Sequence, residues 1–394
     1  MSSAAPPCPP AVPARVLPAL VLAQLAGTSP WFAVNAVMPQ LQRDYGWPAA
    51  DVGTLTSAVQ LGFIAGTLVF ALLAVADRFS PRRVFLLCSL ASAVCTLAAA
   101  ASAGSFVQLL LWRGAGGFFL AGIYPVGMKI ASLWFPRGLG AALGWLIGAL
   151  VLGSASAHAV RAAGAAWPWA GVFVAVASAA ALGGLLLFVA LPERPRAPGR
   201  GSGLQFRALA SIWTEPKVRA PVLGYFGHMW ELYTMWVLVP AILATRLAGA
   251  ALSWAAFAVI ALGAVGCIGG GWWARRAGSA RVAAWQLSIS GACCLLAPWL
   301  LQAPDALFAV WLALWGITVA GDSPQFSALT ASHAPLQAVG SVLTLVNSIG
   351  FGISIVSIQL FVLLAETQPL AVLLPWLGLG PLLGVWALAP LWRR

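Results

Sequence analysis

Long apolar runs separated by short polar gaps make up most of this chain. A helix that crosses the hydrocarbon core of a membrane needs about 20 mostly apolar residues. Cutting the sequence at its charged, proline-rich and glycine-rich breaks gives about twelve segments of this kind. They are 16–40, 51–76, 83–103, 106–134, 138–160, 168–191, 218–245, 251–274, 281–301, 305–332, 336–365 and 370–391. The pattern therefore predicts an all-α integral membrane protein.

Composition excludes the main soluble classes of protein. The 394 residues are 61% hydrophobic and 8% charged, whereas soluble domains carry roughly a quarter charged residues. A soluble enzyme, a nucleic-acid-binding protein and a disordered chain do not fit these values. The six cysteines show no disulfide or metal-ligand spacing. We therefore expect no metal, no cofactor and no nucleic-acid partner.

One polar stretch divides the predicted segments into six and six. Residues 192–217 contain Pro192, Glu193, Arg194, Pro195 and Arg196 and are too polar to cross a membrane. We expect an N-terminal six-helix bundle over 1–191, a cytoplasmic linker over 192–217 and a C-terminal six-helix bundle over 218–394. The protein is expected to be a monomer in the lipid bilayer.

Basic residues indicate the orientation of the segments. With the N-terminus inside, three of the basic residues between segments fall outside, namely Arg43, Arg161 and Arg246. Sixteen fall on the cytoplasmic side: Arg15, Arg78, Arg82, Arg83, Arg137, Arg194, Arg196, Arg200, Arg207, Lys217, Arg219, Arg275, Arg276, Arg281, Arg393 and Arg394. Cytoplasmic loops of membrane proteins carry such an excess. Both termini are therefore predicted to be cytoplasmic, and the net charge of +12 reflects topology.

The two halves of the chain repeat one another. Five landmarks recur at offsets of 198 to 201 residues: Asp77-Arg78 with Arg275-Arg276, Gly117 with Gly316, Pro125 with Pro324, Gly153 with Gly352, and Pro39 with Pro240. A near-constant offset indicates duplication of a six-helix unit. Two parallel halves with a binding site at their interface are typical of transporters.

Two motifs resemble those of a known transporter family. The loop Asp77-Arg78-Phe79-Ser80-Pro81-Arg82-Arg83 is similar to the acidic-then-basic signature of the major facilitator superfamily, although Leu73 and Ser80-Pro81 replace its usual glycines. Arg113-Gly114-Ala115-Gly116-Gly117 resembles its Arg-x-x-x-Gly pattern. The resemblance covers nearly the whole chain. It implies a bacterial transporter of the inner membrane, with two pseudo-symmetric bundles, alternating access and no enzymatic activity.

The resemblance also assigns a role to the loop after the second segment. Asp77, Arg78, Arg82 and Arg83 would form a conformational latch between the cytoplasmic ends of the halves. Topology alone explains the arginines equally well, but it does not explain Asp77.

Ionisable side chains inside membrane segments are costly and usually mark a pathway or a pair. His228 and Glu231 lie three residues apart in the segment 218–245, so they share a face and can touch. A carboxylate beside an imidazole in a low-dielectric environment can exchange protons near neutral pH. We expect His228 and Glu231 to contribute to proton coupling; the alternative is a polar pair that holds this segment to a neighbour.

Asp322 precedes Pro324 in the segment 305–332, where proline kinks a helix. It is the third candidate for proton coupling, and the alternative is a salt bridge to Arg113 or Lys129. Those two basic residues point about 160° apart on a straight helix. We expect Arg113 and Tyr124 to face the pathway. Lys129 would attract a substrate or an acidic group, or extend to the cytoplasmic surface.

Trp31 and Asn35, at positions i and i+4, complete the predicted substrate-binding residues as an aromatic wall and an amide; packing between helices is the alternative.

The sequence therefore predicts a secondary active transporter, proton-coupled, for a small polar, zwitterionic or anionic solute. Two alternatives remain: an efflux pump for amphipathic compounds and a membrane sensor without transport. Ala157-His158 stand where antiporters of the family usually carry Gly-Pro, which disfavours the pump.

Overall fold

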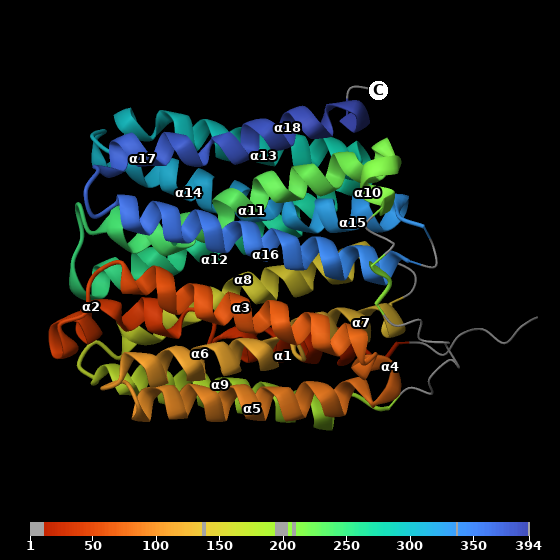
Figure 1. The fold of residues 1–394 in the computed structure, drawn as a ribbon, viewed down its shortest axis with the longest axis horizontal. Coiled ribbons are helices and arrows are strands. Elements are labelled where there is room, and N and C mark those ends of the chain that lie inside the picture. Colours follow the sequence, from red (N-terminus) through yellow and green to blue (C-terminus); the bar gives the residue numbers. More distant parts are fainter. Residues whose placement is uncertain (1–11, 136–138, 194–203, 207–209, 336–337, 393–394) are drawn as a thin grey trace, which may run out of the picture.

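The computed structural model describes residues 12–135, 139–193, 204–206, 210–335 and 338–392. Every regular element among them is a helix. The helices lie side by side in two groups that follow the chain order, the first half red to yellow and the second green to blue in Figure 1. The described ends of the chain lie at one end of this bundle, which we call the terminal end (Figure 1).

The first half corresponds to the six segments predicted over 1–191. Its helices are α1 (Val16–Thr28), α2 (Ala33–Tyr45), α3 (Asp51–Leu72), α4 (Val75–Arg78), α5 (Pro81–Ala101), α6 (Phe106–Leu120), α7 (Tyr124–Trp134), α8 (Leu139–Ala163) and α9 (Trp169–Ala190).

The second half corresponds to the segments predicted over 218–394. Its helices are α11 (Pro216–Leu243), α12 (Gly249–Ala277), α13 (Ser279–Leu300), α14 (Asp305–Gly321), α15 (Ser323–His333), α16 (Val339–Leu364), α17 (Leu370–Leu377) and α18 (Leu379–Trp392). A short helix, α10 (Ala210–Thr214), lies in the segment predicted as a linker.

Four predicted segments are each built from two helices. Breaks separate α1 from α2, α6 from α7, α14 from α15, and α17 from α18. Pro125 and Pro324 occupy the first turns of α7 and α15, where a proline needs no hydrogen-bond partner for its nitrogen. The kink expected beside Asp322 is present, because Asp322 lies between α14 and α15.

One predicted span is less apolar than the others. Eleven helices in the described part of the chain are long and apolar enough to cross a membrane, against about twelve segments predicted. The remaining segment is α11, which has 28 residues but carries His228 and Glu231. Most of its residues are buried, so α11 lies among other helices and needs little apolar surface facing lipid.

The duplication predicted from residue offsets is confirmed by how the halves are packed. A Cβ atom added to Gly117 would overlap the carbonyl oxygen of Val59, and one added to Gly316 would overlap that of Val259. Likewise, a Cβ on Gly66 would overlap the carbonyl of Phe118, and one on Gly266 that of Ile317. These equivalent contacts are 199 or 200 residues apart (316 − 117, 259 − 59, 266 − 66 and 317 − 118). Both halves therefore use the same glycine-lined helix crossing.

The halves meet through two pairs of helices, α8 with α12 and α3 with α16. Gly148 of α8 faces α12, since a Cβ added to it would lie 3.2 Å from Ile268. Between α3 and α16, Gln359 Nε2 donates to Ser57 Oγ at 2.9 Å, and Ser354 Oγ donates to Gln60 Oε1 at 3.1 Å. These contacts between halves are made by neutral groups.

The glycine crossing leads to a test of stability. We expect Gly266→Ala to lower the free energy of unfolding by about 1–3 kcal/mol, because the new methyl group forces α12 away from α14. Gly269→Ala is the matched control: it lies on the same helix, and nothing is within 4 Å of the added Cβ. Tryptophan fluorescence during unfolding in detergent measures both variants. Equal stability of the two variants would contradict the proposed crossing.

Candidate functional site between the halves

A small cavity lies at the interface of the two halves. Aromatic side chains dominate its lining, which includes Tyr124 of α7, Tyr225, Tyr233 and Trp236 of α11, and Phe351 of α16. Its volume of about 30 Å³ has room for on the order of two water molecules. In this conformation the cavity is therefore too small for a solute, and the helices around it must separate before one can bind.

An aromatic cluster joins the halves beside this cavity. The Trp31 ring lies 5.1 Å from Phe63, 6.0 Å from Tyr233 and 5.7 Å from Phe351, between ring centroids. Trp31 and Phe63 belong to the first half, whereas Tyr233 and Phe351 belong to the second. Trp31 is fully buried, so it acts here as a packing residue behind the cavity wall. It does not line the cavity in this conformation, and its role in substrate binding stays a prediction.

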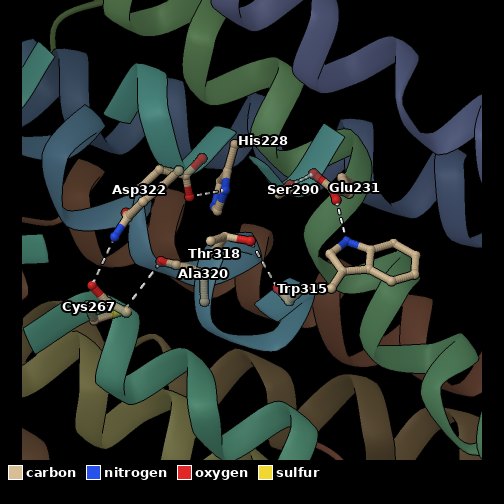
Figure 2. A network of polar contacts seen from close by, with 10 residues as sticks. His228, Glu231, Cys267, Ser290, Trp315, Thr318, Ala320 and Asp322 are labelled. Carbon is tan, nitrogen blue, oxygen red and sulfur yellow. Dashed lines mark hydrogen bonds and ion pairs between the residues drawn. The ribbon is translucent and has the colours of Figure 1, made fainter. Parts of the chain in front are cut away.

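Glu231 is buried in the second half and bound by neutral donors. Trp315 Nε1 donates to Glu231 Oε1 at 2.6 Å, and Cys294 Sγ donates to the same oxygen at 3.2 Å. Ser290 Oγ donates to Oε2, and Figure 2 shows Ser290 and Trp315 on either side of the carboxylate. Only 1% of Glu231 is exposed. No cationic group is paired with it among the described residues.

His228 and Asp322 form a separate buried pair. His228 Nδ1 lies 2.8 Å from Asp322 Oδ1, within ion-pair distance when the imidazole is protonated. Both side chains are almost completely buried, with 1% and 0% exposed. Figure 2 shows this pair apart from Glu231 and its donors. The expected contact between His228 and Glu231 is therefore replaced by two sets of partners, because residues three apart on a helix point about 60° apart.

Arg113 does not face the cavity, contrary to the prediction. Its Nη1 donates to Pro30 O at 2.8 Å and its Nη2 to Trp31 O at 2.5 Å. These carbonyl groups lie where the chain breaks between α1 and α2, and a broken helix leaves carbonyl groups without partners. The buried guanidinium group of Arg113 supplies those hydrogen bonds within the first half. Pro30 in the sequence was the available signal for this break.

Lys129 also lies away from the cavity. It forms an ion pair with Asp77, so one residue predicted to bind substrate contacts one predicted to act as a latch. Arg82 donates to Leu191 O at 2.8 Å and lies 3.5 Å from Glu193. These contacts are all within the first half, and in this conformation they do not join it to the second. The latch role of Asp77, Arg78, Arg82 and Arg83 stays a prediction.

Asn35 pairs with Thr56 inside the first half, where Asn35 Nδ2 donates to Thr56 Oγ1 at 2.9 Å. Of the five residues predicted to bind substrate, Tyr124 lines the cavity. Sequence analysis missed Ser290, Cys294 and Trp315, the donors to Glu231. Ser290 and Cys294 are four residues apart, and Trp315 and Asp322 are seven apart, which are spacings that place residues on one helix face. The polar members of the cavity wall, Ser323, Ser327 and Asn347, were also missed.

A duplicated bundle of apolar helices around a closed central cavity defines a multi-pass membrane transporter. The chain belongs to the Major Facilitator Superfamily, whose family model matches residues 20–358. No curated protein matches the sequence.

Solved structures of this fold resemble the chain over nearly its whole length. A human organic anion transporter, MFSD10 (TETRAN), has a TM-score of 0.74 at 19% identity, covering 95% of this chain and 99% of that one. The proton:xylose symporter XylE has a TM-score of 0.75 at 14% identity, covering 96% and 95%. A bacterial homologue of the human lysosomal transporter Spinster has a TM-score of 0.70 at 17% identity, covering 97% and 96%. At these identities the likeness shows the fold alone.

The hydrogen bond from Trp315 to Glu231 can be tested by a double-mutant cycle. We expect Trp315→Phe to cost about 1.5–3 kcal/mol of unfolding free energy, the range for a hydrogen bond to a charged group. The cost should shrink in a Glu231→Leu background, where no acceptor remains. Trp311→Phe is the matched control, because Trp311 Nε1 donates to the backbone oxygen of Cys293 at 3.0 Å. A cycle showing the same coupling to Glu231 for Trp311 and Trp315 would refute the assignment.

Proposed function

We propose that this superfamily member is a proton-coupled secondary active transporter that moves a small solute across the inner membrane by alternating access. The observation that carries the proposal is the buried carboxylate of Glu231, which is held by neutral donors. A buried charge without a counter-ion is costly, and hydrogen bonds from neutral groups offset only part of that cost. Taking up a proton removes the charge, so Glu231 is suited to bind and release protons during transport.

Glu231 is placed where a change of charge can reach the cavity. The groups that donate to Glu231 belong to α13 and α14. Glu231 itself is on α11, and this helix also lines the cavity through Tyr225, Tyr233 and Trp236. Losing the charge weakens the bonds that hold α11 to α13 and α14. The cavity-lining face of α11 is then less firmly positioned. Protonation thereby favours one conformation over another, which is the requirement for coupling.

The His228–Asp322 pair supplies a second protonatable unit. Asp322 lies at the break between α14 and α15, directly before Ser323 of the cavity wall. A charged imidazole and carboxylate attract one another strongly in a low-dielectric environment, and loss of either charge weakens the pair. We propose that His228 and Asp322 relay or store a proton close to the cavity.

Alternating access is supported by the way the halves are joined. Away from the terminal end, α3 and α16 are linked by neutral hydrogen bonds between Ser57 and Gln359 and between Gln60 and Ser354. Hydrogen bonds between membrane helices are weak, on average about 0.6 kcal/mol. Such contacts can form and break in each cycle of transport.

The proposed orientation rests on basic residues in the described part of the chain. Arg78, Arg82 and Arg83 lie at the α4–α5 turn, and Arg275 and Arg276 end α12, all at the terminal end. Arg246, at the opposite end, is paired with Asp305 at 2.5 Å. This asymmetry favours cytoplasmic termini. Arg137, Arg194, Arg196, Arg200, Arg207, Arg393 and Arg394 lie outside the described residues.

An efflux pump for amphipathic compounds is the second candidate. The aromatic lining of the cavity favours it, because aromatic walls suit ligands with apolar rings. Both candidates share the same cavity and differ in the class of solute.

Glu231→Gln tests proton coupling. We expect the variant to lose accumulation driven by a pH gradient while it keeps exchange of solute across the membrane, because glutamine cannot carry a proton. Uptake and exchange into proteoliposomes would be measured with a solute found by thermal-shift screening. Glu215→Gln is the control, since Glu215 is an exposed residue at the start of the same helix. Normal pH-driven accumulation by Glu231→Gln would remove Glu231 from the coupling role.

Gln359→Ala tests alternating access. The lost hydrogen bond to Ser57 contributes about 0.6 kcal/mol. Its loss should therefore raise about threefold the share of molecules whose halves are separated at the end opposite the termini. Distances between spin labels at the exposed positions Arg43 and Gln368, from double electron–electron resonance, would report that share. Ser348→Ala is the control, since its hydroxyl donates to Thr344 O within α16 at 2.9 Å. An unchanged distance distribution for Gln359→Ala would argue against this contact as a gate.

A further inference from the structure

The central cavity is lined by uncharged side chains. No Asp, Glu, Lys, Arg or His side chain contributes to its wall in the described part of the chain. The wall is formed by aromatic and aliphatic residues together with Ser323, Ser327 and Asn347. A charged solute placed there would lose its hydration and gain no counter-ion, which is costly.

The two basic groups predicted to bind substrate already have partners. Arg113 is held by the carbonyl oxygens of Pro30 and Trp31, and Lys129 is paired with Asp77. Hence neither basic group that the sequence nominated is available to an organic anion. Aromatic faces also carry partial negative charge and so repel an anion.

A cationic solute is disfavoured for a related reason. The two carboxylates closest to the cavity, Glu231 and Asp322, point into the second half and have 1% and 0% of their surface exposed. Ser290 and Trp315 donate to the oxygens of Glu231, and His228 Nδ1 lies 2.8 Å from Asp322 Oδ1. Aromatic rings alone attract a cation by about 0.5–2 kcal/mol, which is far less than the cost of burying an unpaired charge.

The polar groups of the wall remain available to a neutral ligand. Within the described residues, the side chains of Ser323, Ser327 and Asn347 make no hydrogen bond. Ser323 and Ser327 are four residues apart on α15 and so share a face, and α15 packs against α16, which carries Asn347. Together they offer two hydroxyl groups and one amide beside the aromatic residues of the cavity wall.

We infer that this cavity binds neutral, flat aromatic solutes that carry a hydrogen-bonding group. The ring lies against Tyr124, Tyr225 and Phe351, and the polar group binds Asn347 and the two serines. The solute thus differs from the polar, zwitterionic or anionic one that the sequence predicts. The inference rests on the proposed function in one respect, the use of this cavity as the transport site.

Three ligands that share one ring system test the inference: neutral 2-naphthamide, anionic 2-naphthoate and cationic trimethyl(2-naphthyl)ammonium. Binding to the full chain in lipid nanodiscs at pH 7 would be measured by calorimetry, with empty nanodiscs to correct for partition into lipid. We expect the amide to bind at least about tenfold more tightly than either ion. A tenfold difference in affinity corresponds to about 1.4 kcal/mol, and burying an unpaired charge costs more than that.

Asn347→Ala should weaken binding of 2-naphthamide by about three- to tenfold, as expected for loss of one or two neutral hydrogen bonds. Ser348→Ala is the matched control, because Ser348 neighbours Asn347 and bonds within its own helix. Thermal unfolding would confirm that both variants are folded. Tighter or equal binding of either ion, an unchanged affinity in Asn347→Ala, or no binding of the amide would overturn the inference.

Equilibrium binding separates this inference from the proposed function. Binding of 2-naphthamide without any transport into proteoliposomes would refute the proposed transport and leave the assignment of the site standing. Conversely, pH-driven transport of the naphthoate alone would support the transporter and overturn the assigned class of solute.

Discussion

The cost of placing charge in a membrane governs the arrangement of this molecule. The buried ionisable groups that find partners find them inside their own half: Arg113 on the carbonyls of the α1–α2 break, Glu231 on three neutral donors, and His228 on Asp322. The membrane-embedded contacts between halves are made by aromatic rings, glycines and uncharged hydrogen-bonding groups. At an exposed end of the bundle, the carboxylate of Glu366 in the second half accepts from Ala50 N of the first half at 3.3 Å.

This separation of charged and neutral contacts lets the halves move apart at low cost. An ion pair across the interface would have to be broken in a low-dielectric environment, which leaves an uncompensated buried charge. Here the partners of Arg113, Glu231 and His228 all lie within the same half, while the surfaces between the halves exchange only weak contacts. The glycine crossings of α3 with α6 and of α12 with α14 then hold each half together as it moves.

The fold could be predicted almost fully from the sequence, but the site only in part. Topology follows from properties of single segments. These properties are the apolar length of each segment, the basic residues of the loops and the offset of 199 between Gly117 and Gly316. Glu231, His228 and Asp322 were identified because charge in a membrane segment is conspicuous. Their partners were not, since pairing depends on how each helix is rotated about its axis. Arg113 illustrates this: only the break at Pro30 provides the carbonyls that turn it away from the cavity.

The hydrogen bonds between α3 and α16 have a consequence for how such a protein changes over generations. Ser57, Gln60 and Gln359 lie outside the cavity wall, whereas Phe351, on the same helix as Gln359, belongs to it. Substitutions at the first group alter the balance between conformers without altering the ligand's surroundings. Speed and selectivity are thereby under nearly independent mutational control, and natural selection can adjust one while conserving the other.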